Sequence, residues 1–195
     1  PRSSIWLSSP CTGGSTWQRF NIKRGDLTQQ KIKQLWKGFE QIWKSFINIA
    51  DHAIQHTIPI YIEWPRHCRY WHTPRVQRFL RKHGGTATNV DGCAYGLVSP
   101  EGRPIKKPWR IHCISSTLSQ HLNKACPKDH QRQHLEGAAT RRSQHYPQQM
   151  SSDIHKAIAI DLGRPTTFTA AVVDSDDESV DGDRVVYAPV ANTTL

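Results

Sequence analysis

The chain has 195 residues, of which 26 are Lys or Arg and 16 are Asp or Glu, so its formal net charge is +10. This length suits one domain with a short appendage, and no apolar run reaches the roughly 18 residues of a membrane-spanning helix. Five cysteines at scattered spacings do not form a disulfide framework, so we expect free or metal-bound thiols in a reducing intracellular compartment, nuclear or cytoplasmic. Because the chain opens without Met, we expect a piece of a longer polypeptide.

The charge is unevenly distributed. Residues 151–195 contain eight acidic side chains against three basic ones, a balance of −5, which leaves +15 on residues 1–150. Such a basic body favours a polyanionic partner, most simply DNA, over a solvated surface without a partner. Residues 163–195, with the acidic run at 174–179, are typical of a disordered tail or linker.

Strand-like and helix-like segments alternate along residues 1–162. Apolar residues at three- and four-residue steps predict the helices, and short apolar runs bounded by Gly, Pro and Ser predict the strands. The predicted elements are a strand at 4–8, a helix at 26–54, a strand at 58–62, a helix at 73–83, strands at 86–95 and 110–114, and helices at 116–122 and 152–162. This order predicts an α/β layer with a largely parallel sheet.

Two reactive side chains follow successive predicted strands. Ligands bind at the carboxyl ends of strands in such sheets, and Cys11 and Glu63 would share that edge. A Cys after Pro and before small residues is a candidate nucleophile, since cationic surroundings favour its thiolate. A carboxyl group beside it can protonate or polarise a ring nitrogen. Taken singly, either residue is also compatible with an inert thiol or a surface carboxylate.

Several short motifs carry a family resemblance over about residues 5–160. They are Ser9-Pro10-Cys11-Thr12, Ile62-Glu63-Trp64-Pro65, Val90-Asp91-Gly92-Cys93-Ala94-Tyr95-Gly96-Leu97, Pro104-Ile105-Lys106-Lys107-Pro108-Trp109, and a Cys/His cluster from Cys126 to His134. The first two resemble the Pro-Cys loop and the second catalytic strand of DNA cytosine-5 methyltransferases. The order of all five is similar to that in phage-type relatives and in those carried by retrotransposon polyproteins.

The resemblance implies a fold and a reaction. It implies a partial Rossmann-like, class I methyltransferase-like layer with mostly parallel strands over residues 1–162, with a His/Cys-rich extension at 110–150. The Cys11 thiolate would add to C6 of a flipped cytosine, and Glu63 would hydrogen-bond its N3 and amine. C5 would then take a methyl group from S-adenosylmethionine. Substrate contacts would come from Pro10, Thr12, Trp64, Pro65, Lys106, Lys107 and Arg110.

Two functions remain open at this stage. The family's Gly-rich cofactor half precedes the Pro-Cys loop, and this chain contains no such segment, so we expect methyl transfer only with an upstream half. The alternative is a non-catalytic, basic nucleic-acid-binding segment of a retrotransposon polyprotein, with or without zinc.

A metal site is also predicted. Cys126, His130 and His134 are four residues apart in succession, and zinc accepts Cys and His in tetrahedral geometry. Cys113 or His112 would supply the fourth ligand. The usual Cys-x2-Cys half is absent, and the alternative is a metal-free, His-rich basic surface.

Overall fold

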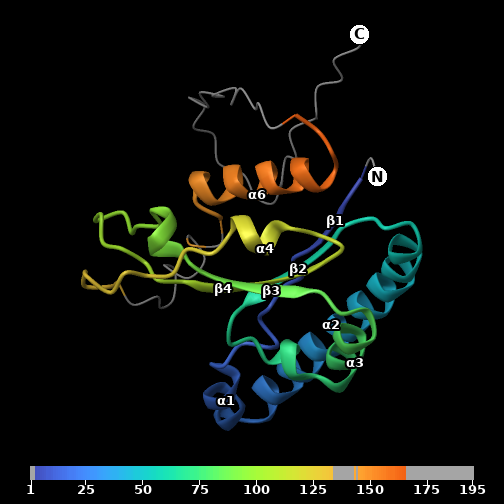
Figure 1. The fold of residues 1–195 in the computed structure, drawn as a ribbon. Helices are drawn as coiled ribbons and strands as arrows, with labels where there is room; N and C mark the ends of the chain where they lie inside the picture. The colour runs from blue at the N-terminus through green and yellow to red at the C-terminus, as the bar shows by residue number, and fades with distance from the viewer. Residues whose placement is uncertain (1–2, 134–142, 144, 166–195) are drawn as a thin grey trace, which may run out of the picture.

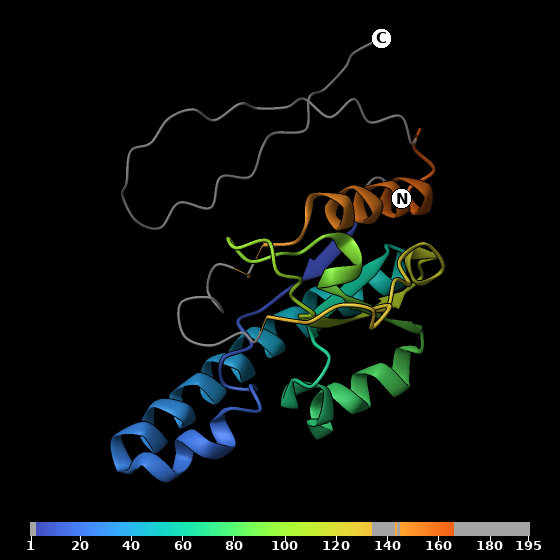
Figure 2. The same ribbon diagram turned by 90° about the vertical axis from the view of Figure 1, so that its left-hand side faces the viewer.

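The structure, a computed structural model, describes residues 3–133, 143 and 145–165. Helices lie on both faces of a four-stranded sheet, with α2 and α3 on one face and α4 and α6 on the other (Figure 1). The same layers are visible from the side in Figure 2. No helix in this part of the chain is long and apolar enough to cross a membrane. From residue 166 onward, the predicted acidic tail lies outside the described residues.

The observed elements follow the predicted order closely. They are β1 (Ile5–Leu7), α1 (Gln18–Asn21), η1 (Ile22–Arg24), α2 (Asp26–Gln55), β2 (Ile60–Pro65), η2 (Arg69–His72), α3 (Pro74–His83), β3 (Thr86–Asp91), η3 (Gly92–Tyr95), β4 (Pro108–Ile114), α4 (Leu118–His121) and α6 (Gln148–Asp161). Local sequence sets several boundaries. The Thr73 hydroxyl accepts a hydrogen bond from the Val76 amide at the start of α3, and Gly84 ends that helix at a φ of 67°.

The strand directions differ from the prediction. The order is β1-β2-β4-β3, with β1 parallel to β2 and with β4 antiparallel to both of its neighbours. The expectation of mostly parallel strands was therefore wrong, because the sheet is mixed and mostly antiparallel. A parallel return needs a long crossover, usually a helix. The chain from β3 to β4 contains only the short turn η3 and a loop, so β4 runs back beside β3.

Each face of the sheet has its own apolar core. Ile60, Ile62 and Trp64 of β2 pack with the aromatic face of α2, where Trp43 is almost fully buried. The intervening Tyr61 packs in a second cluster with α6. This period of two is the strand's own alternation, and it places Glu63 on the α6 face.

The strand register places several strand termini along one edge of the sheet, which we call the rim. Leu7 pairs with Ile62 at the end of β1, and Pro65 pairs with Trp109 at the end of β2. Asp91, at the end of β3, pairs with Pro108 at the start of β4. Three strand ends and one strand start therefore lie on the rim, together with the loops that follow or precede them.

Asp161 fixes α6 to the sheet and to α4. Its carboxylate accepts hydrogen bonds from the Tyr61 hydroxyl at 2.6 Å, the Ser116 hydroxyl at 2.5 Å and the Thr117 amide at 2.8 Å. Burial acts to raise the pKa of Asp161, but these hydrogen bonds outweigh it, and the pKa lies below its usual value. The stabilisation is therefore present above the usual carboxyl pKa and is lost as the pH falls through the lowered one.

We expect Asp161→Asn to lower the free energy of unfolding by about 1–3 kcal/mol, because an amide replaces an ionised acceptor of several hydrogen bonds. Asp51→Asn is the control, since the Asp51 side chain is 41% exposed and pairs with Lys82 at the surface. It should cost less than about 1 kcal/mol. Urea unfolding measures both variants, and equal losses would contradict the anchoring role of Asp161.

Candidate active site

Cys11 lies half-buried in the loop that follows β1. The next glycines bring this loop close to η2 and the residue before it. A Cβ atom on Gly13 would lie 2.6 Å from the Tyr70 hydroxyl, and one on Gly14 would lie 2.6 Å from the Cys68 sulfur. Small residues are thus required here for packing of the loop, and this packing positions the Cys11 thiol at the rim.

Glu63 is held in a buried hydrogen-bonded setting. It is only 4% exposed, and its Oε2 accepts hydrogen bonds from the Ser8 hydroxyl and the Tyr146 hydroxyl, both at 2.6 Å. Tyr146 packs edge-on against Trp6 and Trp109, with ring centroids 6.3 and 5.5 Å away. Two aromatic rings therefore orient the tyrosine that orients the carboxyl group.

Glu63 holds its proton more tightly than an exposed carboxyl group does, because it is buried. Burial raises the pKa of Glu63, while the Ser8 and Tyr146 hydroxyls and the charge of Lys107 lower it, and the net pKa is above its usual value. A buried carboxyl with a raised pKa is suited to donate a proton to a bound base.

Lys107 lies near both reactive groups. Its amino group donates a hydrogen bond to the Ser143 carbonyl and lies 5.2 Å from the Trp109 ring centroid. Burial lowers the pKa of Lys107, and the charges of Glu63 and Cys11 raise it. The structure thus brings Cys11, Glu63 and Lys107 into one electrostatic cluster, which we call the rim triad.

The pKa of the Cys11 thiol is raised, whereas the sequence predicted that cationic surroundings would lower it. Burial and then the Glu63 charge raise its pKa, whereas its own backbone and Lys107 lower it. One nearby cation does not offset the loss of solvent and the adjacent carboxylate. In the free protein the thiol form is therefore favoured.

Trp64, predicted as a substrate contact, is a core residue. Strand alternation turns its side chain to the face opposite Glu63, where it is 1% exposed. Its indole N–H donates to the Ser9 hydroxyl at 3.0 Å. Trp64 therefore supports the Pro-Cys loop from beneath, and the prediction that it contacts a substrate was wrong.

The other predicted substrate contacts divide between the rim and its surroundings. Pro10 and Thr12 are exposed on the Cys11 loop, while Pro65 and Lys106 are half-buried at the rim. Arg110 points to the other face of the sheet, where its guanidinium lies 5.5 Å from the Trp71 ring centroid. The structure does not bring Arg110 into the rim triad.

A Cys/His group lies at the far end of the rim. The ligand atoms of Cys93, Cys126 and His130 are within 4.8 Å of one another, and the group could hold a metal ion. Cys113 is not part of it and is buried in the core on β4, and His112 hydrogen-bonds the Gly84 carbonyl. The predicted fourth ligand was therefore wrong.

His134, a further predicted ligand, lies outside the described residues. Sequence reasoning missed Cys93 because it is 33 residues from Cys126 in the chain. The predicted strand at 86–95 included Cys93, whereas β3 ends at Asp91 and Cys93 lies in the turn that follows.

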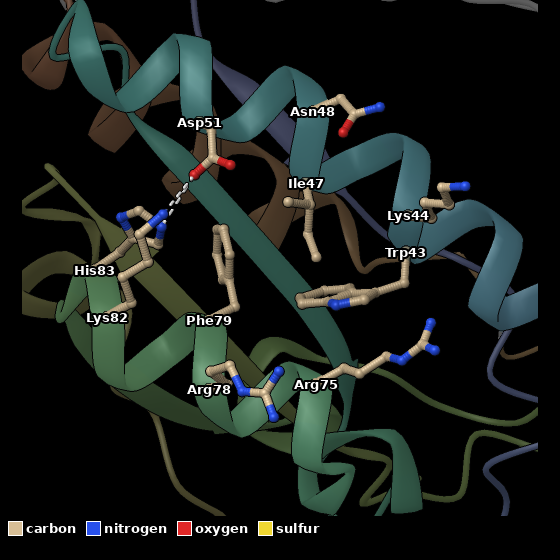
Figure 3. A pocket seen from close by; sticks show the side chains of 10 residues that line it. All are labelled: Trp43, Lys44, Ile47, Asn48, Asp51, Arg75, Arg78, Phe79, Lys82 and His83. Carbon is tan, nitrogen blue, oxygen red and sulfur yellow. Dashed lines mark hydrogen bonds and ion pairs between the residues drawn. The ribbon is translucent and has the colours of Figure 1, made fainter.

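A groove lined by basic residues lies between α2 and α3, on the face of the sheet opposite Glu63. It is an open groove of about 460 Å³, and Figure 3 shows basic side chains from both helices around an apolar floor. The basic residues are Lys44, Arg75, Arg78 and Lys82, and the floor is formed by Trp43, Ile47 and Phe79. Asp51 also lines the groove and pairs with Lys82 and His83. A groove of this charge suits phosphate groups.

Comparison of the chain with protein-family models, curated proteins and solved structures finds no match.

We expect Glu63→Gln to become more stable than the wild type as the pH rises. The folded wild type holds the Glu63 proton more tightly than the unfolded chain. The resulting stabilisation is full below the usual carboxyl pKa and is lost as the pH rises through the raised one. Gln keeps the shape and the acceptor for Ser8 and Tyr146 but does not ionise.

The measurement is urea unfolding of both proteins between about pH 4 and pH 8. Glu40→Gln, at an exposed position on α2, removes the same charge as a control. A stability difference for Glu63→Gln that stays constant with pH would refute the burial of an ionisable Glu63.

Proposed function

We propose that this chain carries the base-activating part of a DNA cytosine-5 methyltransferase-like domain, with Cys11 as the nucleophile and Glu63 as the acid. The supporting observation is the rim triad: the thiol follows β1, the buried carboxyl lies near the end of the adjacent parallel strand β2, and the charge of Glu63 raises the pKa of Cys11. Cys11, Glu63 and Lys107 come from three segments far apart in the sequence, so their convergence is not a consequence of local chain geometry.

The sheet topology also supports this proposal. In class I methyltransferase folds, the final strand lies antiparallel between the two strands that precede it. Here β4 lies antiparallel between β2 and β3, next to the parallel pair of β1 and β2. A mixed sheet of this order supports an assignment to the later part of such a layer, with the Cys11 loop after β1 and Glu63 within β2.

The rim triad suits nucleophilic addition to a pyrimidine ring. The Cys11 thiolate attacks C6 of a cytosine removed from its stack, and the C5–C6 double-bond electrons move through the ring as N3 takes a proton from Glu63. The ring becomes an enamine whose C5 is nucleophilic. C5 then takes up a proton from solvent while the N3 proton returns to the Glu63 carboxylate. Loss of one of the two C5 protons to a base, with departure of the Cys11 thiolate from C6, restores the aromatic ring.

The coupled pKa values fit this step. The reactive form needs a thiolate at position 11 and a proton on Glu63. A neutral Glu63 no longer raises the pKa of Cys11, while the Lys107 charge continues to lower it. The thiolate of Cys11 is therefore easier to form when Glu63 holds its proton.

The described residues do not fit S-adenosylmethionine. The glycine-containing turn after β1 packs against Tyr70 and Cys68 where a Cβ would stand, so it leaves no cradle for a nucleoside. No other described strand leads through a Gly-rich turn into a helix. The steps assigned to this chain are therefore base binding, thiolate addition and proton transfer to N3.

A non-catalytic nucleic-acid-binding role is the second candidate. The net charge of +10 and the groove between α2 and α3 favour it. Plain phosphate binding does not require a carboxyl group buried beside a cysteine, and it leaves the rim triad without a purpose. The two functions differ in one testable respect, the chemistry at C5 of cytosine.

We expect the chain to exchange the C5 hydrogen of cytosine in single-stranded DNA for deuterium in D₂O. Thiolate addition makes C5 basic, so it takes a deuteron from solvent, and elimination releases the original proton. This reaction needs no methyl donor. Mass spectrometry of the recovered nucleosides measures the exchange.

Cys11→Ala should abolish the exchange, and Glu63→Gln should slow it by about 10²–10⁴-fold, the usual contribution of a general acid. Cys113→Ala, which removes a thiol from the β4 core, should retain it. Exchange that persists in Cys11→Ala, or wild-type exchange no faster than in buffer, would contradict the proposal.

We expect DNA binding to weaken steeply between about 50 and 200 mM salt, because phosphate contacts release counterions. Lys106→Ala at the rim should reduce the slope of log affinity against log salt by about one. Lys156→Ala removes the same charge from an exposed position on α6 and should leave the slope unchanged. Fluorescence anisotropy gives the slopes, and a flat salt response would argue against DNA as the partner.

A further inference from the structure

Three soft-metal ligands converge where two loops meet at the rim. Cys93 lies in η3, just after β3, and Cys126 and His130 lie in the loop that follows α4. Their ligand atoms are within 4.8 Å of one another, and the Cys126 sulfur is 3.6 Å from Nε2 of His130. Two sulfurs and one imidazole nitrogen at these separations match the first coordination sphere of a zinc ion after a small contraction.

The surrounding residues orient this group as the outer shell of a metal site does. Asp129 Oδ1 lies 2.8 Å from Nδ1 of His130, which leaves Nε2 free to face the sulfurs. The Cys126 amide donates to Asp91 at 3.0 Å, and Asp91 also accepts from Arg66 at 3.0 Å. A carboxylate on the far nitrogen of a ligating histidine is a common outer-shell arrangement in zinc proteins.

We propose that Cys93, Cys126 and His130 bind one zinc ion that joins the turn after β3 to the loop after α4. Thiolates and imidazole select zinc over magnesium or calcium, which prefer oxygen ligands. Cys126 is buried while Cys93 and His130 are half-exposed, so the ion lies at the edge of the core with access from solvent. The remaining tetrahedral position is open to water or to a further side chain.

The ion would also stabilise the loop that carries Lys107. The Gly92 amide, next to Cys93, donates to the carbonyls of Lys106 and Lys107 at 2.5 and 3.1 Å. On the other side of the group, the Gln133 amide donates to the Pro104 carbonyl at 2.9 Å. A metal between Cys93 and His130 thus fastens both segments that hold residues 104–107. This structural role is independent of whether the chain acts on cytosine.

The test is metal titration of the full chain, reduced and stripped with a chelator. We expect one equivalent of zinc to bind, and one equivalent of cobalt(II) to give an intense thiolate-to-cobalt absorption band with the visible bands of a tetrahedral ion. Cys126→Ser should weaken zinc binding by at least about 100-fold. Asp129→Asn should weaken it by about 10-fold, the lower end of outer-shell effects.

Matched variants separate this site from the other thiols and imidazoles. Cys11→Ala and His72→Ala, which removes an exposed imidazole of η2, should each retain one equivalent at wild-type affinity. A cobalt complex of the wild type without a thiolate band would overturn the proposal whatever the variants do. A Cys93–Cys126 disulfide that persists after treatment with a reductant would also overturn it. So would an unchanged zinc affinity in Cys126→Ser.

Discussion

The parallel pairing of β1 with β2 is the constraint on which the candidate site depends. Only three register pairs join the strands, from Ile5 with Ile60 to Leu7 with Ile62. Because both strands run in the same direction, the Pro-Cys loop leaves the sheet beside Glu63, and Ser8 reaches its carboxylate. An antiparallel arrangement would put Cys11 at the opposite edge of the sheet. The core under α2 stabilises this pairing, since β1 and β2 both contribute side chains to it.

Local sequence patterns predicted the helices and strands well, because the formation of these elements depends mainly on residues close together in the chain. The helix from Asp26 has a continuous apolar stripe, and α3 has both a Thr-Pro start and a glycine end. Strand direction is not local. It depends on whether the connection is long enough to cross the sheet, and the connection from β3 to β4 contains only η3 and a loop. The sequence therefore indicated an α/β layer but not its mostly antiparallel sheet.

The candidate site was predictable to the extent that backbone position determines it. The sequence predicted Cys11 and Glu63 just past successive strands; in the structure Cys11 follows β1, Glu63 lies within β2, and the Glu63 charge raises the pKa of Cys11. The partners of Glu63 depend on packing between distant segments, so local sequence patterns did not predict the hydrogen bond from Tyr146. Trp64 could have been assigned to the core from the alternation along β2, because its neighbour Glu63 lies on the other face. Cys93 required knowledge that η3 and the loop after α4 meet.

The central claim is that Cys11 and Glu63 interact electrostatically at a shared edge of the sheet. Its most direct measurement is the pH dependence of alkylation of the half-exposed Cys11 thiol, followed by peptide mass spectrometry in the wild type and in Glu63→Gln. We expect the pKa of Cys11 to fall in Glu63→Gln, because the carboxylate charge that raises it is removed. An unchanged pKa of Cys11 would mean that the two groups do not lie together, and the proposed reaction would lose its basis.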